Sequence, residues 1–430
     1  MGRKSGGVAR TTLFGMVFLK LLLFHHAFVI GPTAGLVTVA RWVAGATTVL
    51  VVASMGYNLL ALFAAMSFRA YVRRRVPELT AETAPAVSVL KPVKGLDPGM
   101  MEAFRGHCRQ AYAGEFELIF GASSEADAAV EAVRELMAEF PEVAIRLVIC
   151  PERLGTSGKV SNLIQMLPEA SYEHVLINDS DIVVSPKYLT RVMRQFGLPK
   201  RAARPVGMVT ALYRGRAHGT VWSMLEALGI STDFMAGVLT SRVVEGGMHF
   251  GLGSTLAVRR DALEAAGGLE ALVDQLADDY EMGARIDRAG YEVRLATEVV
   301  ETSVPAYDLR GYWSHQIRWA RTVRDSRRWG YAGLIFTHML PLALMNVLAS
   351  GASLWSLWLL SLVVFLRLGV AMQVGAVVVG DHQVLGNLWL LPARDLAGFA
   401  IWVGGFAGNE IVWRGERFLL KNGRLFKVEP

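Results

Sequence analysis

Cysteine is scarce in this sequence, with two residues in 430, Cys108 and Cys150. Their spacing matches neither a zinc site nor a redox pair, and we assign neither of them a catalytic role. Disulfides are rare in reducing compartments, so a chain this poor in cysteine is expected to place its soluble part in the cytosol.

Charge is scarce as well, since 19% of the residues are charged, 53% are hydrophobic and the mean hydropathy is +0.35. These values exclude an ordinary soluble pair of domains. The sequence has no internal repeat and no low-complexity tract. The apolar excess lies at the two ends, and residues 82–328 have the composition of one cytosolic domain.

The net charge of +6 comes mainly from arginines beside the apolar segments. This distribution favours an anionic lipid surface as partner and argues against nucleic acid. Residues 1–68 form the N-terminal membrane region, of which 43–68 is an uncharged run long enough to cross a bilayer. The run at 13–30 contains Lys20, His25 and His26, and could be a poor membrane helix, a misplaced start or a signal-like extension.

Four arginines, at positions 69, 73, 74 and 75, follow the firm membrane segment and place the next domain in the cytoplasm by the positive-inside rule. The C-terminal membrane region, 331–413, has three apolar segments at 331–349, 354–380 and 396–412, and a basic cytosolic tail follows at 414–430. Three crossings cannot connect two cytoplasmic ends, so one segment should be re-entrant or interfacial. Arg367 should face other helices, reach the interface or mark a helix end.

Short β-rich runs alternate with helical stretches between these flanks. Such alternation predicts an α/β domain with a mostly parallel, doubly wound sheet. The domain should end in an amphipathic interfacial helix at 312–329. The predicted strands are 87–90, 118–122, 145–149, 175–177 and 208–212, and the predicted helices are 126–139, 159–167 and 188–196.

The fourth predicted strand ends in two carboxylates one residue apart, Asp179 and Asp181. Ligands collect beyond the carboxyl ends of parallel strands, and two close carboxylates repel each other unless a cation lies between them. Mg²⁺ or Mn²⁺ is commonly held by one or two carboxylates together with substrate phosphates. On these residues alone, an Asx turn with solvated acids is the simpler interpretation.

Two further residues follow predicted strands or begin predicted helices. Asp97 could accept hydrogen bonds from a nucleotide, and a turn or N-cap acid is an equal alternative. Lys159 begins a helix in a loop, GTSGKVSN, that lacks the spacing of a P-loop. A lysine there opposes the helix dipole, which indicates an anionic partner, although a solvated lysine explains it equally well.

Two later elements complete the set. Asp278 and Asp279 precede a predicted helix, where one could be an N-cap or the general base that takes a proton from a hydroxyl. His315, Arg318 and Trp319 share one helical face, which gives two phosphate donors beside an aromatic side chain.

With these elements in this order, the chain resembles membrane glycosyltransferases of the GT-A fold, most closely the ceramide glucosyltransferase family, glycosyltransferase family 21. The family shows three separated aspartates and then Arg/Gln-x-x-Arg-Trp, and within it the chain looks most like bacterial hopanoid-biosynthesis glycosyltransferases. His315 departs from the pattern, which has arginine or glutamine at this position. Histidine can donate to a phosphate, but imidazole loses its charge above a pKa of about 6.5, so this contribution would fade at higher pH. The segments that carry the resemblance are KPVKGLDP at 91–98, KVSNL at 159–163, NDSD at 178–181, DDY at 278–280 and HQIRW at 315–319.

The resemblance implies an inverting, UDP-sugar-dependent hexosyltransferase that moves N-acetylglucosamine or glucose to a hydroxyl of a membrane lipid. It favours a hopanoid acceptor such as bacteriohopanetetrol, with ceramide as the alternative. A processive polysaccharide synthase, or a non-catalytic lipid-binding protein whose acids are only caps, is more distant. The implied location is the bacterial inner membrane, multi-pass, with the catalytic domain facing the cytoplasm.

The resemblance also assigns roles to the residues. Asp279 would be the general base, and Asp97 would hold the uridine. A divalent cation, Mg²⁺ or Mn²⁺, would lie at Asp181 and Asp179, with Asp181 the preferred direct ligand. The residues that would close over the diphosphate and stabilise the departing UDP are Lys159, His315, Arg318 and Trp319, with Asp179 also beside the donor.

Overall fold

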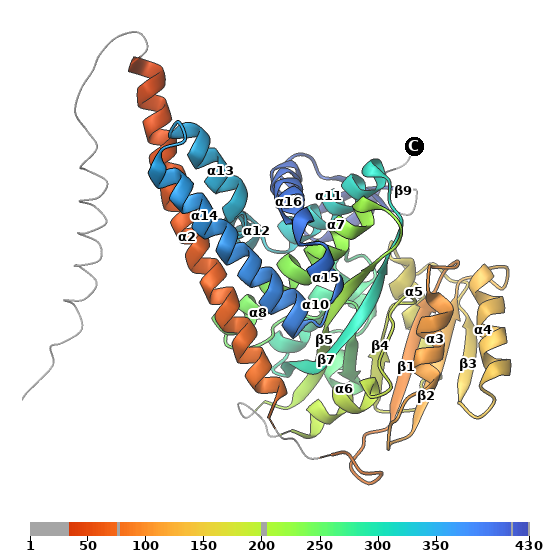
Figure 1. Cartoon of the computed structure of the whole chain (residues 1–430). Coiled ribbons are helices and arrows are strands. Elements are labelled where there is room, and N and C mark those ends of the chain that lie inside the picture. Colours follow the sequence, from red (N-terminus) through yellow and green to blue (C-terminus); the bar gives the residue numbers. More distant parts are fainter. Residues whose placement is uncertain (1–33, 75–77, 199–203, 414–415, 429–430) are drawn as a thin grey trace, which may run out of the picture.

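The structure is a computed structural model, and it describes residues 34–74, 78–198, 204–413 and 416–428. An α/β domain lies beside a group of long apolar helices (Figure 1). The apolar run at 13–30 and Arg75 lie outside the described residues.

A seven-stranded sheet forms the centre of the α/β domain, in the order β3-β2-β1-β4-β6-β5-β7. Neighbouring strands are parallel except at β6, which is antiparallel to both β4 and β5. The predicted α/β class with a mostly parallel sheet is therefore confirmed. The strands are β1 Val87–Val93, β2 Phe116–Ala122, β3 Ile145–Ile149, β4 His174–Ile177, β5 Val206–Ala217, β6 Leu256–Arg259 and β7 Glu292–Val304.

The five strands predicted from the sequence all form, because each is a short, mainly apolar run. Four of them are buried along the predicted residues, whereas the edge strand β3 is only partly buried. Val175, Leu176 and Ile177 of β4, for example, are completely buried. The prediction missed β6 and β7. Strand β7 includes Glu292, Arg294, Glu298 and Glu301, so it does not read as a continuous apolar run.

Helices connect most of these strands, and several begin at capping side chains. Asp127 accepts a hydrogen bond from the backbone of Ala129 at the start of α4, and Ser157 accepts one from Val160 at the start of α5. A short π-helix, Ile230–Phe234, joins α7 to α8. The helices are α3 Met100–Cys108, α4 Ala128–Glu139, α5 Gly158–Met166, α6 Tyr188–Gly197, α7 Val221–Gly229, α8 Met235–Val244, α9 Arg260–Ala265, α10 Asp278–Arg288 and α11 Leu309–Ser326.

Two of the described helices are long and apolar enough to cross a membrane. One is Val37–Val72 within α2 (Ala34–Val72), and the other is Leu354–Val378, which combines α14 (Leu354–Val370) with the π-helical η5 (Ala371–Val378). A third candidate passes only as a pair bent by 61°, Arg328–Thr337 with Met339–Ala349. The elements of this pair are α12 Arg328–Gly333, η4 Leu334–Thr337 and α13 Met339–Ala349.

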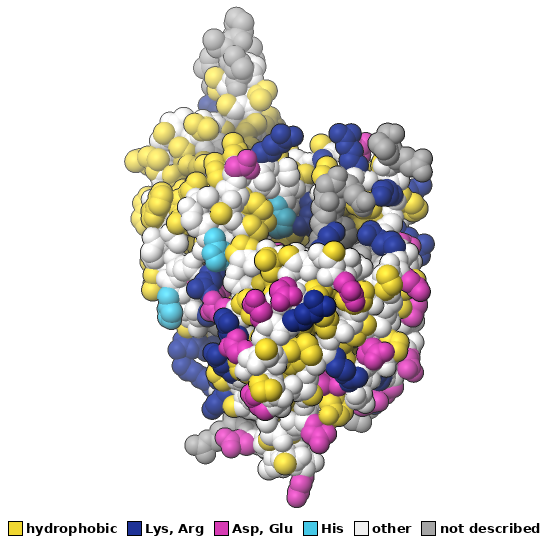
Figure 2. All heavy atoms as spheres, turned by 90° about the vertical axis from the view of Figure 1, so that its right-hand side faces the viewer, with side chains coloured by type: hydrophobic (Ala, Val, Ile, Leu, Met, Phe, Trp, Pro, Cys, Tyr) yellow, Lys and Arg dark blue, Asp and Glu magenta, His cyan; other side chains and the backbone are white. Residues whose placement is uncertain are grey.

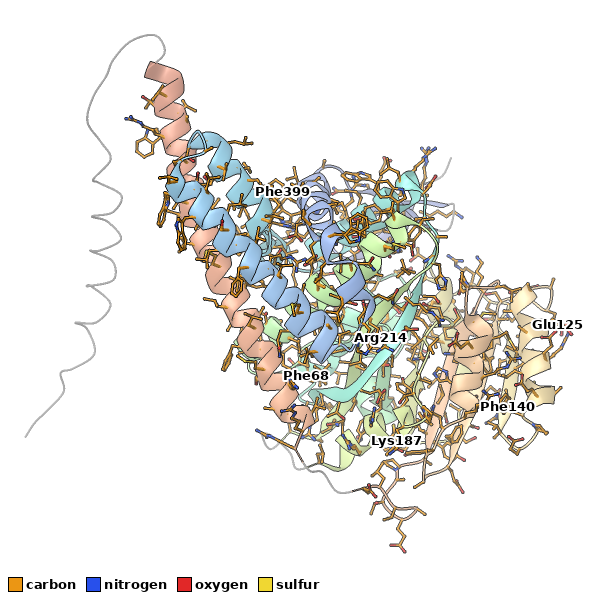
Figure 3. All side chains as sticks on the ribbon, viewed as in Figure 1. Phe68, Glu125, Phe140, Lys187, Arg214 and Phe399 are labelled. Atoms are coloured by element: carbon orange, nitrogen blue, oxygen red, sulfur yellow. The ribbon has the colours of Figure 1, made fainter. Side chains whose placement is uncertain are left out.

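Helix α2 is part of the α/β domain as well as of the helix group. It packs against α13 and α14 at one end and against α8 at the other (Figure 1). Ala61, Ala64, Ala65 and Phe68 belong to the same buried core as the strands of the sheet, and Figure 3 shows Phe68 near the domain end of α2. The domain is therefore fixed to α2 by packing and not only by the chain.

The surface of the molecule is divided in the same way. Hydrophobic side chains gather at the upper left of the view in Figure 2, whereas several Lys and Arg side chains lie at the upper right. Acidic and basic side chains are scattered over the α/β domain below. Large exposed side chains on α14 include Leu354, Trp358 and Phe365, which are at least 73% exposed. Such a contiguous apolar surface is typical of a membrane-contacting region.

The C-terminal region differs from the prediction. The predicted apolar segment 396–412 is divided between α16 (Leu391–Gly405) and the strand β8 (Glu410–Trp413), and α16 is not among the candidate spans. When the bent pair is counted as one span, two candidate crossings follow the α/β domain. An even number of crossings is compatible with the two cytoplasmic ends predicted from the sequence, whereas three crossings are not.

The predicted basic tail, 414–430, contains two strands in its described part, 416–428. Asn422 and Gly423 have φ angles of 51° and 77°, as in the tight turns that Asn-Gly favours. Phe418, Leu420 and Leu425 are buried with Ile411 and Leu276, so alternating apolar residues support the small sheet. The strands are β9 Glu416–Lys421 and β10 Arg424–Lys427, and a short helix, α15 Gln383–Gly386, precedes α16.

Arg367 of α14 is 5% exposed and lies in an ion-pair network between the helix group and the α/β domain. Its guanidinium group lies 2.8 Å from Asp395 of α16 and 2.6 Å from Asp233 of the π-helix. The expectation that Arg367 faces other helices is confirmed. A second polar connection between the α/β domain and the helix group is Arg214 of β5, which is labelled in Figure 3. It pairs with Glu301 and donates a hydrogen bond to the backbone oxygen of Gly380.

We expect Arg367→Met to destabilise the protein, because it leaves the buried carboxylate of Asp395 without its partner. Breaking a buried ion pair in this way costs about 3–5 kcal/mol. Thermal unfolding in detergent should show a clearly lower midpoint, whereas Arg134→Met on the exposed face of α4 should leave it unchanged. Equal midpoints for both variants would contradict the structural role of the network.

Candidate active site

The carboxyl ends of two neighbouring strands bring the first two predicted acidic elements together. Strands β1 and β4 are parallel neighbours, and the loops after them carry Asp97 and the segment Asp179 to Asp181. The Ser180 hydroxyl donates a hydrogen bond of 2.8 Å to Asp97 Oδ2. Asp97 is exposed, so it can reach a ligand above this edge of the sheet.

The turn that carries these acids is held from beneath by a buried lysine. Lys91 of β1 is fully buried, and its ammonium donates to Asn178 Oδ1 at 2.5 Å and to the backbone oxygen of Asp179 at 2.9 Å. Burial lowers the pKa of Lys91 to about 7, although Asp181 and Asp179 oppose this shift. No role for Lys91 was predicted from the sequence, in which it appears only as the first residue of the segment KPVKGLDP.

Lys159, in the first turn of α5, joins the acids of the β4 loop to those of α10. Its ammonium lies 2.6 Å from Asp179 Oδ1 and 3.6 Å from Asp278 Oδ2. Burial alone would lower the pKa of Lys159, but Asp179 and Asp278 raise it above its usual value. The side chain is 20% exposed and ion-paired, so it is not the solvated lysine that the alternative interpretation required.

Asp279 faces the same space as Asp179. A Cβ atom on Gly253 would lie 3.0 Å from Asp279 Oδ2 and 3.6 Å from Asp179 Oδ2. The N-cap position of α10 is Ala277, and neither Asp278 nor Asp279 caps the helix in place of it. Burial and the neighbouring Asp278 raise the pKa of Asp279 to about 6, against the opposing charge of Lys159.

The loop that leads to Asp279 is held by two other parts of the chain. The Thr156 backbone N–H donates to Asp274 Oδ1 at 2.9 Å. Strand β10 pairs with the same loop, since Leu276 N donates to Gly423 O and Leu425 N donates to Asp274 O, each at 3.0 Å. The C-terminal sheet therefore fixes the position from which α10 begins.

Asp181 is oriented by the end of β7. Its Oδ2 atom accepts hydrogen bonds from Thr302 Oγ1 at 2.5 Å and from the backbone of Ser303 at 3.1 Å. Burial, reinforced by the charge of Asp179, raises the pKa of Asp181. A nearby cation would relieve this repulsion.

Helix α11 carries the last predicted element. The His315 ring stacks on Tyr307, with centroids 5.4 Å apart and an interplanar angle of 26°, and lies 5.4 Å from the Trp319 ring. His315 Nδ1 lies 3.1 Å from the carboxylate of Glu226. Arg318 lies between His315 and Trp319 in the sequence, and its charge acts on Tyr307.

An aromatic pair connects α11 to the acids. Phe234 lies 5.8 Å from the Tyr213 ring and 6.0 Å from the Trp319 ring. Burial raises the pKa of the Tyr213 hydroxyl well above its usual value, and the charges of Asp279, Asp179 and Glu226 add to the shift. Tyr213 therefore senses the charges of both the β4 loop and the start of α10.

Sequence reasoning missed Tyr213 and Glu226. Tyr213 ends an apolar strand and gives no signal of its own. Glu226 does give one, since it is the single charged residue of the apolar helix α7, VWSMLEALG. A buried lone acid in such a helix usually has a specific partner.

The described part of the candidate site supplies two carboxylates for a divalent cation, but not a complete set of protein ligands. Among the described residues, no three His, Cys, Asp or Glu side chains converge as a complete metal site. Magnesium, however, is commonly held by one or two carboxylates plus phosphate oxygens, and Mn²⁺ also prefers oxygen ligands. Asp179 and Asp181 supply such carboxylates at the edge where a diphosphate would lie.

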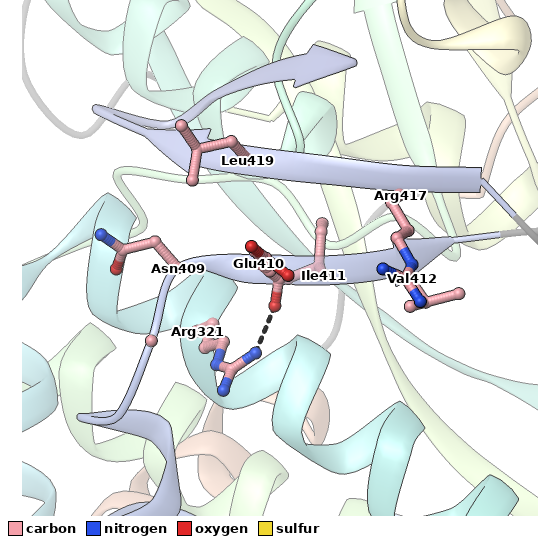
Figure 4. Close-up of a pocket in the computed structure, with 8 residues that line it drawn as sticks. Arg321, Asn409, Glu410, Ile411, Val412, Arg417 and Leu419 are labelled. Carbon is pink, nitrogen blue, oxygen red and sulfur yellow. Dashed lines mark hydrogen bonds between the residues drawn. The ribbon is translucent and has the colours of Figure 1, made fainter. Parts of the chain in front are cut away.

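A cavity of about 640 Å³ lies beside α11, against the C-terminal sheet (Figure 4). Arg321 of α11 donates hydrogen bonds there to the backbone oxygens of Glu410 and Ala407. None of the acids of the candidate active site lines this cavity, which is bounded by Arg321, Gly408, Asn409, Glu410, Ile411, Val412, Arg417 and Leu419.

Comparison with known proteins decides the family. A sequence model of glycosyl transferase family 21 matches residues 46–426. The chain belongs to glycosyl transferase family 21. This confirms the family that the sequence predicted, whereas the likeness to the hopanoid-biosynthesis members stays a prediction.

Two relatives of this family 21 chain come from Caenorhabditis elegans. Ceramide glucosyltransferase 1 is 24% identical over 239 residues, which are 56% of this chain and 50% of that protein. Ceramide glucosyltransferase 3 is 23% identical over 365 residues, which are 79% of this chain and 73% of that protein. The family 21 chain thus spans about half of the first relative and about three quarters of the second.

One solved structure is similar in fold to this chain. The mannosyltransferase PcManGT from Pyrobaculum calidifontis, solved in complex with GDP-Man and Mn²⁺, superposes with a TM-score of 0.52. The match covers 85% of this chain and 99% of PcManGT at 21% sequence identity. The predicted GT-A fold, with apolar helices attached, is therefore confirmed.

We expect Gly253→Ala to lower turnover without unfolding the protein, because its methyl group would press on Asp279 and displace it by a few tenths of an ångström. Small displacements of reacting groups reduce rates by about tenfold or more. The control is Gly237→Ala on α8, whose added Cβ would have its nearest neighbour at 3.8 Å. If both variants turn over like wild type, the space above Gly253 does not hold the reacting groups.

Proposed function

We propose that this protein is an inverting glycosyltransferase that moves a hexose from a UDP-sugar to a hydroxyl group of a membrane lipid. One observation carries the proposal: Asp279 and Asp179 face a common space at the carboxyl edge of a GT-A sheet. In that space a base and a donor-binding acid can act on the two sides of one sugar carbon. Family membership and the attached apolar helices support it.

Asp279 is the proposed general base. A base works best when its pKa lies near the working pH, because it is then deprotonated yet still accepts a proton readily. The pKa of Asp279, raised to about 6, meets this condition. It takes the proton of the acceptor hydroxyl as that oxygen attacks the anomeric carbon. A single displacement inverts the anomeric centre, so an α-linked donor gives a β-linked product.

The remaining residues are proposed to bind the donor. Asp97 holds the uridine. Asp179 and Asp181 lie at a divalent cation, Mg²⁺ or Mn²⁺, and Asp181 is the preferred direct ligand. The cation supplies charge stabilisation for the leaving diphosphate. The residues that bind the diphosphate and stabilise the leaving UDP are Lys159, His315, Arg318 and Trp319.

The acceptor is proposed to arrive from the bilayer. Helix α2 shares its core with the α/β domain, so the site is held at a fixed position relative to the apolar helices. Arg69, Arg73 and Arg74 at the domain end of α2 support a multi-pass inner-membrane protein with a cytoplasmic catalytic domain. The resemblance of the sequence motifs favours a hopanoid polyol and N-acetylglucosamine, whereas the two named relatives favour ceramide and glucose.

The decisive experiment incubates the purified protein with UDP-glucose or UDP-N-acetylglucosamine, each with bacteriohopanetetrol or ceramide, and detects products by mass spectrometry. We expect a single-sugar glycolipid that forms with Mg²⁺ or Mn²⁺ and disappears when EDTA removes the cation. A ladder of polymer lengths would instead indicate a polysaccharide synthase. Absence of any product with every lipid of a total extract would reject lipid glycosylation.

We expect turnover of the wild-type protein to fall as the pH is lowered through about 6, because protonated Asp279 cannot accept the hydroxyl proton. Asp279→Asn should lose about 10²–10⁴-fold in turnover while UDP still binds. Glu281→Gln, on the same helix and paired with Arg285, is the matched control and should keep the wild-type pH profile. Unchanged turnover of Asp279→Asn would remove Asp279 as the base.

A further inference from the structure

Glu226 is a buried acid at the candidate active site that the proposed roles leave unused. It is 4% exposed and is the single charged residue of the apolar helix α7. Both of its carboxylate oxygens lie 3.1 Å from His315 Nδ1. Among the described residues, His315 is the one side chain that hydrogen-bonds to this carboxylate.

The imidazole ring of His315 has little freedom to turn. Tyr307 stacks on it at 5.4 Å with an angle of 26°, and the Trp319 ring lies at 5.4 Å and 49°. Glu226 occupies Nδ1, which leaves Nε2 at the opposite side of the ring. The side chain of His315 is 21% exposed, so a ligand can reach it. Nε2 makes none of the hydrogen bonds found between described residues.

The pair lies beside the acids of the donor site. The Trp319 ring beside His315 lies 6.0 Å from the Phe234 ring, which lies 5.8 Å from the Tyr213 ring. Burial, together with the charges of Asp279, Asp179 and Glu226, raises the pKa of the Tyr213 hydroxyl. Arg394, which packs against Gly229 at the end of α7, forms its ion pair with Asp233 at 3.1 Å. A buried carboxylate without a hydrogen-bond donor is costly, and Nδ1 of His315 is placed to donate to Glu226.

We infer that Glu226 is a positioning residue for His315: it accepts the Nδ1–H and thereby directs the Nε2–H toward a diphosphate oxygen of the donor. A carboxylate behind a histidine fixes the ring orientation and tautomer in the same way in other protein sites. The Glu226–His315 pair then donates the hydrogen bond to the diphosphate that an arginine would donate where the family pattern has one. The inference rests on the proposed function, because it needs a diphosphate at this place.

The test measures UDP binding by calorimetry in detergent with Mg²⁺ present, for wild type, Glu226→Gln, His315→Ala and the double variant. A hydrogen bond to a charged group corresponds to about a tenfold change in affinity, so we expect each single variant to bind UDP about tenfold more weakly. The double variant should bind no more weakly than His315→Ala alone, because Glu226 acts through His315. His315→Arg should restore affinity in the Glu226→Gln background, since arginine stays charged without a partner.

Glu298→Gln is the matched control. Glu298 is another buried acid, 3% exposed and paired with Arg191, but it is not part of the site. It should lower thermal stability and leave UDP affinity unchanged. Wild-type affinity in Glu226→Gln, or losses that simply add in the double variant, would overturn the inference. If wild type itself fails to bind UDP, the proposed function fails instead.

Discussion

Repulsion between carboxylates is the constraint on which the candidate site depends. Asp97, Asp179 and Asp181 follow two adjacent strands, and α10 brings Asp278 and Asp279 to the same place. Two lysines make this arrangement possible, Lys159 between the two groups and Lys91 beneath the turn. A diphosphate would add further negative charge, which explains why cationic side chains of α11 and a divalent cation belong to the proposed mechanism.

The apolar helices belong to the same mechanical unit as the site. Helix α2 contributes to the core of the sheet domain, and Arg367 ties α14 to the π-helix through Asp233. The next residue of that π-helix, Phe234, lies between Tyr213 and Trp319. A displacement of α14 would therefore act directly on the aromatic side chains beside the acids, because packed interiors transmit strain.

Much of the fold could be predicted because its central strands are apolar runs followed by acids. Strand β6 is short and antiparallel, and β7 carries charged residues that pair mainly within the sheet, so neither has the pattern of a buried parallel strand. Most of the predicted acids and Lys159 meet at one edge of the sheet, since they lie in loops or at helix starts that local patterns reveal, whereas His315, Arg318 and Trp319 lie within α11. Glu226 could not be assigned, because its role arises from a contact between two distant helices. The Asn-Gly turn at 422–423 is a local signal for the two strands that the described part of the basic tail contains.

Pairing between the loop at 274–276 and strand β10 gives this protein an order of assembly. The loop is synthesised before α13 and α14, whereas its partners Gly423 and Leu425 come after both. During translation, the α/β domain can form its sheet before the C-terminus is made, but the segment before Asp279 lacks two of its backbone hydrogen bonds until β10 has emerged from the ribosome. The proposed base site is therefore completed only when the last described strand of the chain has been synthesised.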